Sequence, residues 1–308
     1  MTGQTAIANA PVTFGAFEIT VGRDPNVPDS LSVLDAIQHA GYAGTDLGPP
    51  GYFGTPSELA GRLRERGLGL AGGFVEFPLS QPEGMDAALS HLDRTLDIFD
   101  AVREQVAAPY PPRPTIADTG SAERQAHPGQ SHLRHELGLD DAGWRTLQEQ
   151  VHRVVERCRQ RGYEPTFHPE TGTYIEAPWE IEKLLELTDI GLCLDTGHLT
   201  LGGGDPVAAV REWGSRINHI HIKDARLQII RQIVDNGGSA EDVWRKRAFC
   251  QFGHGDVDID GVLSGLKEMS YAGWIVVEQD RLPEATEPVT QIEQEQAANL
   301  RFLTERGF

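Results

Sequence analysis

The sequence predicts an α/β protein that folds as a single (β/α)8 barrel, the TIM barrel, over residues 1–308. Short apolar runs alternate with helical stretches along the whole chain, which is typical of a parallel sheet. No linker or low-complexity segment divides the 308 residues into two domains. An open nucleotide-binding sheet would carry a glycine-rich loop after its first strand, and the Arg-Asp-Pro that follows Gly22 is not such a loop.

The first half of the chain predicts four strand–helix units. Strands are expected at residues 12–20, 43–47, 68–79 and 115–118, the last beginning only after the proline-rich residues 109–114. Helices are expected at residues 30–40, 56–66 and 83–107, and a fourth is expected after a cap at Asp140 or Asp141, with an apolar stripe from Trp144 to Cys158. Thr55, Pro56 and Glu58 form a capping-box pattern, and Gly41 and Gly67 are natural helix ends. Residues 119–140 are expected to form a long loop.

The second half predicts four further strands at residues 164–170, 190–195, 217–223 and 274–278. Helices are expected to begin at Pro178, at Pro206 and after Asp260, and a final helix to cover residues 289–306. Residues 227–247 do not fit the strand–helix alternation. They are expected to form a helical insertion after the seventh strand.

Each of these last four strands closes with a side chain that can bind a divalent metal. The residues are Glu170, Asp195, His221 and Glu278. The carboxyl ends of barrel strands meet on one face, where such barrels carry their active sites. The sequence therefore predicts that ligands far apart in the chain surround one ion.

Composition narrows the choice of partners and compartment. Lys and Arg number 27 against 46 Asp and Glu, a formal charge of −19, which disfavours nucleic acid and anionic membranes as partners. No apolar stretch is long enough to span a membrane, and residues 1–10 lack the features of a signal peptide. Cys158, Cys193 and Cys250 are too dispersed for a disulfide framework or a CxxC zinc site. A cytoplasmic protein with reduced, buried thiols is expected.

Several motifs together resemble a known family. They are GYAGTDLGPPGYF (residues 41–53), GGFVEFPL (72–79), HPETGT (168–173), LDTGH (194–198), HIHIKD (219–224) and the closing ANLRFL (298–303). This set is similar to the inosose dehydratases, which belong to the xylose isomerase-like, sugar-phosphate isomerase/epimerase TIM-barrel superfamily. The resemblance extends over nearly the whole chain.

The resemblance implies one catalytic divalent ion held by Glu170, Asp195, His221 and Glu278, with Glu170 and Glu278 also able to act as bases. Mn²⁺ is the expected ion, and Co²⁺ and Mg²⁺ are the alternatives, because three carboxylates and one imidazole form a hard ligand set. Such an ion lowers the free-energy cost of a carbanion next to a carbonyl. The expected ligand is a small keto-sugar or keto-cyclitol. A homo-oligomer is compatible with the resemblance, because dimers and tetramers are common in this superfamily.

Further site residues are expected around the ion. His198 and Lys223 are predicted to be catalytic. His198 follows Asp195 by three residues and Lys223 shares a side of its strand with His221, so both could contact substrate oxygens. His168, Glu176 and Arg226 are predicted to bind substrate. The dehydratases carry His at the position of Glu170, whereas the epimerase branch carries Glu there and a second Glu that matches Glu176. Weaker candidates in the loops at the barrel mouth are Glu18, Glu76 and His254.

The predicted reaction begins with removal of a proton next to a carbonyl. Loss of a β-hydroxyl afterwards would make a dehydratase, the leading hypothesis. Reprotonation would make an epimerase or isomerase, and loss of a larger group would make a lyase of 3-keto-glycosides, including C-glycosides. An abasic-site endonuclease from the same superfamily is disfavoured by the charge of −19. A barrel that binds metal without catalysis is disfavoured by the complete ligand set.

Overall fold

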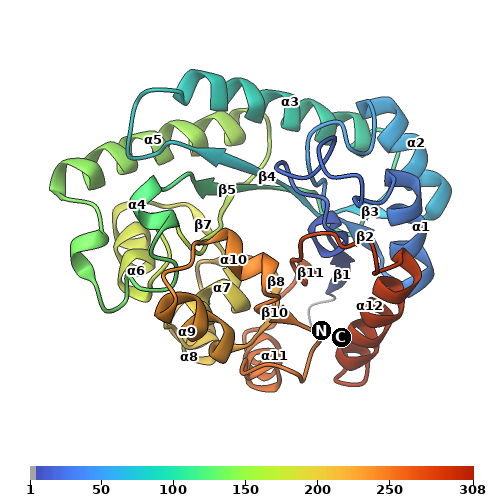
Figure 1. The fold of residues 1–308 in the computed structure, drawn as a ribbon. Helices are drawn as coiled ribbons and strands as arrows, with labels where there is room; N and C mark the ends of the chain where they lie inside the picture. Colours follow the sequence, from blue (N-terminus) through green and yellow to red (C-terminus); the bar gives the residue numbers. More distant parts are fainter. Residues whose placement is uncertain (1–4) are drawn as a thin grey trace.

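The computed structural model describes residues 5–308, which form a closed barrel of parallel strands surrounded by helices (Figure 1). The barrel strands are β1 (Ala6–Asn9), β2 (Gly44–Thr45), β3 (Gly69–Leu70), β4 (Gly72–Phe77), β5 (Arg113–Asp118), β6 (Thr166–Phe167), β7 (Gly191–Asp195), β8 (Ile217–Ile222) and β11 (Trp274–Val277). Their order is β3-β2-β1-β11-β8-β7-β6-β5-β4. A separate two-stranded antiparallel sheet joins β9 (Asp224–Ala225) and β10 (Phe249–Cys250).

One residue closes the ring. Only Ala71 separates β3 from β4, and its backbone N–H donates to the Thr45 carbonyl at 2.9 Å while its own carbonyl accepts from Arg113 N at 3.0 Å. The two segments therefore act as one interrupted strand that pairs on both sides. Counted in this way the barrel has eight strands, and the predicted (β/α)8 fold is confirmed.

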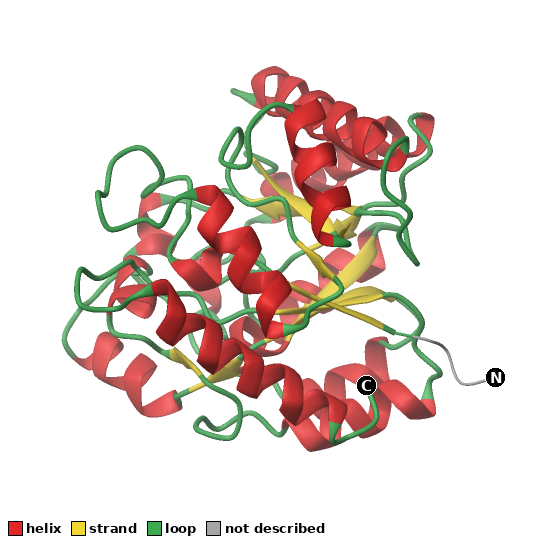
Figure 2. Cartoon of the chain, turned by 90° about the vertical axis from the view of Figure 1, so that its right-hand side faces the viewer, coloured by secondary structure: helices red, strands yellow, loops and turns green. Residues whose placement is uncertain are grey.

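The helices pack around the outside of the strands (Figure 2). They are α1 (Ser30–Ala40), α2 (Pro56–Arg66), α3 (Met85–Arg103), α4 (Ala122–Gln125), α5 (Asp141–Gln160), α6 (Pro178–Leu187), α7 (Thr196–Leu201), α8 (Pro206–Trp213), α9 (Leu227–Asp235), α10 (Glu241–Arg245), α11 (Ile259–Glu268) and α12 (Val289–Thr304), with 3-10 helices η1 (Pro11–Phe14) and η2 (His135–Leu137). The α9–α10 pair is the predicted insertion, because β8 is the seventh barrel strand. No helix within residues 5–308 is both long and apolar enough to cross a membrane.

Local sequence signals set the helix boundaries. Thr55 Oγ1 accepts from Glu58 N at 3.3 Å, and the Glu58 carboxylate accepts from Thr55 N at 2.7 Å, so the predicted capping box is present. Gly41 and Gly67 end α1 and α2 with φ of 96° and 64°, a left-handed conformation that favours glycine. These predictions are confirmed.

The predicted first strand at residues 12–20 is wrong. The strand is β1, whose Ala6 and Ala8 side chains lie in a small cluster with Trp274. The Trp274 ring fills the interior there so closely that a Cβ at Gly44 would lie 2.8 Å from it. Small residues are therefore required at this end of the barrel, and an alanine-rich strand gives little apolar signal. Residues 11–14 instead form η1.

Three smaller expectations also differ from the structure. Pro114 lies inside β5, where it pairs with Gly73, although the proline-rich segment was expected to stay irregular. Helix α11 is capped by Asp258, which accepts from Gly261 N at 2.8 Å, and Asp260 inside the helix forms an ion pair with Arg306 instead. Of the expected strand 164–170, only β6 is regular. Residues 1–4, part of the segment in which no signal peptide is expected, lie outside the described residues.

Candidate metal centre and substrate cavity

Four side chains from the ends of neighbouring strands meet at one face of the barrel. His168 follows β6, Asp195 closes β7, His221 lies in β8 and Glu278 follows β11. One ligand atom from each lies within 4.8 Å of those of the other three. All four are buried, with at most 5% of any residue exposed. The parallel order of these strands brings together residues that lie far apart in the sequence.

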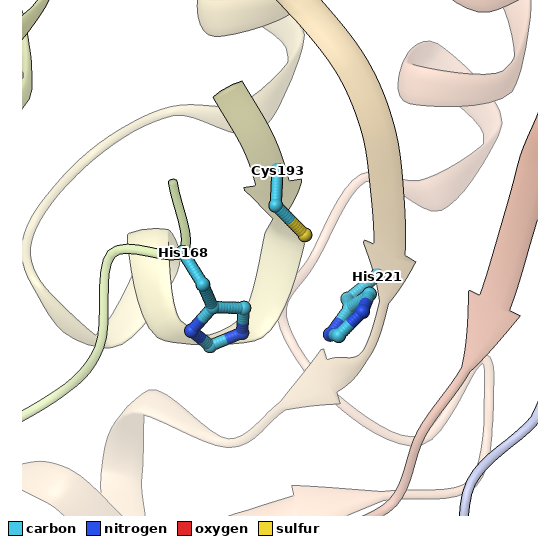
Figure 3. Close-up of side chains that lie close together, drawn as sticks. All are labelled: His168, Cys193 and His221. Atoms are coloured by element: carbon cyan, nitrogen blue, oxygen red, sulfur yellow. The ribbon is translucent and has the colours of Figure 1, made fainter. Parts of the chain in front are cut away.

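Strand alternation arranges the inward side chains in two layers. Asp195 and His221 are register partners on β7 and β8, and two residues earlier Cys193 and His219 are register partners as well. Residues i and i+2 of a strand share a face, so both pairs face the barrel interior at different depths. Figure 3 shows the Cys193 sulfur near the facing rings of His168 and His221.

Lys223 is bound by three carboxylates beside this group. Its Nζ lies 2.8 Å from Asp195 Oδ2, 2.6 Å from Glu278 Oε2 and 3.2 Å from Asp280 Oδ2. Burial alone would lower the pKa of Lys223, but these carboxylates outweigh it and hold the pKa well above its usual value. The ammonium group is therefore charged.

The surrounding charges set the protonation of the four central residues. Burial lowers the pKa of His168 to about 4, so its imidazole is neutral and able to bind a metal. Burial would raise the pKa of Asp195 and Glu278, but Lys223 and neighbouring histidines hold both pKa values below their usual range. Burial would lower the pKa of His221, but Cys193 and Glu278 raise it above its usual value.

The residues present fit a divalent cation. His168 Nδ1 and His221 Nε2 are buried without a hydrogen-bond partner among residues 5–308, whereas His221 Nδ1 lies 3.0 Å from Glu278 Oε2. Buried polar atoms without partners are uncommon and call for a ligand or another specific cause. Three carboxylates, from Asp195, Glu278 and Asp280, share the single ammonium of Lys223, so further positive charge would be stabilised here.

A cavity of about 160 Å³ lies over this centre. Its lining includes charged or polar side chains, from Glu18, Asp46, Glu76, His168, Glu170, His198, His221, Lys223, Glu278 and Asp280. It also includes apolar side chains, from Pro11, Val12, Phe17, Ile19, Pro49, Phe74 and Trp244. This combination suits a compact ligand that has both hydroxyl groups and an apolar ring face.

Two predicted site residues line the cavity outside the group of four. His198 Nδ1 accepts from the Thr171 backbone N–H at 3.2 Å, so in the neutral ring the proton lies on Nε2, which is 3.8 Å from Asp280 Oδ2. Glu170 lines the cavity, but it is not a member of the close ligand group. Its Oε2 is buried without a hydrogen-bond partner in the described part of the chain, and burial raises its pKa.

Glu176, expected to bind substrate, lies away from the cavity. Its carboxylate accepts from Gly129 N at 2.7 Å, from Gly172 N at 2.9 Å and from Ser131 Oγ at 2.8 Å, and it lies 3.4 Å from Arg124. All of these contacts are internal to the loops beside the site. The structure therefore gives Glu176 a positioning role for these loops.

Arg226, the other expected substrate contact, also lies outside the main cavity. It lines a separate cavity of about 210 Å³ together with His254. Arg226 follows β9 directly, and its backbone N–H donates to the Ala248 carbonyl at 2.8 Å. Glu18 and Glu76 do line the main cavity. Desolvation and the carboxylates of Glu170, Glu18 and Asp118 raise the pKa of Glu76 to about 8.

Sequence reasoning missed three cavity residues. Asp46 lies just beyond β2, with Oδ2 4.0 Å from His221 Nε2, and burial raises its pKa to about 6. Asp280 follows Glu278 by two residues and binds Lys223. Spacing alone could have identified both, since each lies within a few residues of a barrel strand's carboxyl end. Trp244 comes from α10 of the insertion, where no sequence signal connects it to the site.

Replacing Trp244 by Phe should weaken substrate binding. Trp244 lines the cavity, and its Nε1 is buried without a hydrogen-bond partner within residues 5–308. Phe keeps an aromatic ring against Phe17, whose centroid lies 5.5 Å away, but removes the N–H. Loss of one hydrogen bond to substrate should raise KM by about three- to tenfold with little change in kcat. Steady-state kinetics would measure this.

Trp144→Phe is the matched control for this variant. Its Nε1 is also buried without a hydrogen-bond partner in the described residues, but it belongs to α5 and packs beneath Lys183, whose Nζ lies 4.8 Å from the ring centroid. Its KM should stay at the wild-type value. Equal KM values for both variants and the wild type would show that the Trp244 N–H does not contact substrate.

Fold and site together define a barrel protein with a buried His/carboxylate centre beneath a small, partly charged cavity. A family model described as the xylose isomerase-like TIM barrel matches residues 34–306. The chain belongs to this family.

Characterised relatives refine this assignment. The inosose dehydratase of Geobacillus kaustophilus is 27% identical over 264 residues, which cover 84% of this chain and 82% of that protein. The rhizopine catabolism protein MocC of Rhizobium meliloti is 29% identical over 309 residues, covering 98% and 90%. The protein is therefore an enzyme and an inosose dehydratase-like member of the family.

Solved structures agree on the fold. The IOLI protein, whose crystal structure contains a bound zinc atom, superposes with a TM-score of 0.71 over 98% of this chain and 99% of that chain at 13% identity. An L-ribulose 3-epimerase superposes with a TM-score of 0.64 over 98% and 94% at 15% identity. At these identities the likeness concerns the barrel alone.

Proposed function

We propose that the protein is a divalent-metal-dependent dehydratase that acts on a keto-cyclitol of the 2-keto-myo-inositol type. The observation that carries this proposal is the buried group of His168, Asp195, His221 and Glu278 at the floor of a small cavity, with the Lys223 ammonium beside it. The inosose dehydratases among the relatives support the substrate class.

We further propose that these four residues hold one ion, with His168 in the place that the sequence assigns to Glu170. Two imidazoles and two carboxylates suit Mn²⁺, the ion we favour, and also Co²⁺. A divalent ion bound here would polarise a carbonyl and stabilise negative charge on its oxygen. Glu170 is then left free of the ion; it lines the cavity, and its Oε2 has no hydrogen-bond partner among residues 5–308.

The chain's own residues could carry the proton transfers. Lys223 Nζ can donate a hydrogen bond to a substrate oxygen that becomes negative. Glu170 Oε2 has no partner among the described residues, and its raised pKa suits a group that accepts and returns a proton. In the proposed reaction the α-carbon loses a proton, the β-carbon loses its hydroxyl, a C=C bond forms, and the hydroxyl leaves as water after gaining a proton.

Cavity size favours this reaction over elimination from a keto-glycoside. Pockets that enclose drug-sized ligands measure about 300–1,000 Å³, whereas this cavity holds about 160 Å³. A single six-membered ring with its hydroxyls is a better match than a sugar that carries an aglycone. We also propose a cytoplasmic location, which is in keeping with three free, buried cysteines.

Proton NMR of the Mn²⁺-loaded protein with 2-keto-myo-inositol in D2O tests this proposal. The expected result is a dehydrated diketone, which forms when the enol left by the elimination takes up a solvent proton at the former β-carbon, so that this carbon carries deuterium. Deuterium exchange without dehydration would overturn the dehydratase assignment in favour of an epimerase or isomerase. No exchange and no product would reject this substrate and direct the same assay to keto-glycosides.

A further inference from the structure

We propose that His168 and His221 serve two alternative ion positions, and that thiophilic ions such as Cd²⁺ and Zn²⁺ occupy the deeper one. The upper position uses the carboxylates of Asp195 and Glu278, as described above. The lower position uses the sulfur of Cys193. The proposal uses the same imidazole pair as the proposed function, but it does not depend on which reaction the enzyme performs.

The geometry supports the lower position directly. One ligand atom each from His168, Cys193 and His221 lies within 4.8 Å of the other two, and all three residues are buried. Figure 3 shows the sulfur near the two rings. Cys193 belongs to no such close group with a carboxylate among the described residues, so the two positions share the imidazoles and differ in their remaining ligands.

Buried nitrogens without partners surround the lower position. His168 Nδ1 and His221 Nε2 make no hydrogen bond with any residue from 5 to 308, and His221 Nδ1 contacts only the Glu278 carboxylate, at 3.0 Å, and the Asp195 carboxylate, at 3.8 Å, among the ion pairs of these residues. His219, the register partner of Cys193, also has both ring nitrogens unpartnered, and its ring centroid lies 5.2 Å from that of His221. The layer around the sulfur therefore contains lone pairs that a cation could satisfy.

Ligand chemistry separates the two positions. Thiolate and imidazole ligands favour soft or borderline ions, whereas carboxylates favour Mn²⁺ and Mg²⁺. As the metal–sulfur bond forms, the Cys193 thiol loses its proton to solvent. Because both positions need His168 and His221, occupation of one excludes occupation of the other. A thiophilic ion in the lower position would therefore displace Mn²⁺ from the upper one.

Cadmium titration tests this assignment without an activity assay. Metal-free wild type and the variants Cys193→Ser, Cys158→Ser and Cys250→Ser would be titrated with Cd²⁺ while the ultraviolet thiolate-to-cadmium charge-transfer band is followed. We expect one equivalent of Cd²⁺ to give the band in wild type and in the Cys158 and Cys250 variants, but not in Cys193→Ser. All three cysteines are buried, so the two controls match the test position in exposure.

Competition with Mn²⁺, followed by the electron paramagnetic resonance of free Mn²⁺, provides the second measurement. Cys193→Ser should weaken Cd²⁺ binding by at least about tenfold and leave Mn²⁺ affinity nearly unchanged. Cys193→Ala, checked by circular dichroism, should behave in the same way if the serine variant fails to fold. A band that persists in both Cys193 variants, or no band in wild type, would overturn the lower position. A silent dehydratase assay alongside a Cys193-dependent band would reject only the proposed function.

Discussion

The Glu278→Gln variant is expected to lose turnover by about 10²–10⁴-fold in kcat/KM. Glu278 Oε2 lies 2.6 Å from Lys223 Nζ and 3.0 Å from His221 Nδ1, and its residue is only 5% exposed. Gln has the same shape but lacks the negative charge, so it binds the ion more weakly and stabilises its positive charge less. Kinetics under saturating Mn²⁺, together with the bound-metal content, would measure the loss.

The same change should not unfold the protein. Lys223 keeps Asp195 at 2.8 Å and Asp280 at 3.2 Å, so its buried charge stays compensated. His221 and Lys223 hold the pKa of Glu278 below its usual range, so loss of this charge removes some stability from the metal-free state. The variant should still fold, with a melting temperature without metal somewhat below that of wild type. Glu164→Gln, on an exposed ion pair with Arg159, is the control and should keep full activity. A fully active Glu278→Gln enzyme would disprove the assignment.

Arg124→Met should destabilise the fold by about 3–5 kcal/mol. The Arg124 guanidinium makes two hydrogen bonds to Glu180, at 2.7 and 3.1 Å, and lies 3.4 Å from Glu176. All three residues are at most 1% exposed. Met would leave two buried carboxylates without a positive partner, next to the loops that carry His168 and Glu170. Urea unfolding would measure the difference.

The stability that Arg124→Met loses should depend on pH. Burial already raises the pKa of Glu176, and removal of the guanidinium would raise it further above the unfolded value. A carboxylate whose pKa is raised on folding binds more protons when folded, so its stability deficit grows as the pH rises. Arg124→Met should therefore be less destabilised at pH 5.5 than at pH 8. Arg157→Met, which breaks an equally bidentate but exposed pair with Asp93, should cost under about 1 kcal/mol. Equal losses of unfolding free energy for the two variants would show that burial of the Arg124 ion pair does not set its contribution to stability.

Strong local patterns in the sequence were enough to predict most helices and strands of the barrel. The helix of residues 30–40 and the capping box at Thr55 depend on neighbouring side chains, and both were predictable. Strand β1 was not, because its alanines are selected by the Trp274 ring on a strand from the other end of the sequence. Pro114 is accepted in β5 for a similar reason, since pairing with neighbouring strands decides the outcome there.

The site also contains residues that the sequence predicts and residues that it does not. Asp195, His221 and Glu278 were predictable as strand ends, and the structure brings them together. His168 and Glu170 share one side of an extended segment, so periodicity could not decide which of them approaches the other three. The structure brings His168 into the group, because β6 is regular only over two residues and ends immediately before it. The place of Trp244 in the cavity wall depends on the shape of the insertion, which leaves little trace in sequence.

The pairing of β1 with β11 has a consequence for biosynthesis. Ala6 to Asn9 lie beside Trp274 to Val277, and the Asn9 amide donates to Gln296 Oε1 at 3.0 Å. During translation β1 leaves the ribosome long before its partner strand β11 has been synthesised. At about 5–20 residues per second the delay between the two strands is roughly tens of seconds. During that time the nascent chain has an unpaired strand edge that could associate with other chains. A strand of only four residues, two of them alanine, is a poor template for such contacts, so its shortness should reduce the demand on chaperones.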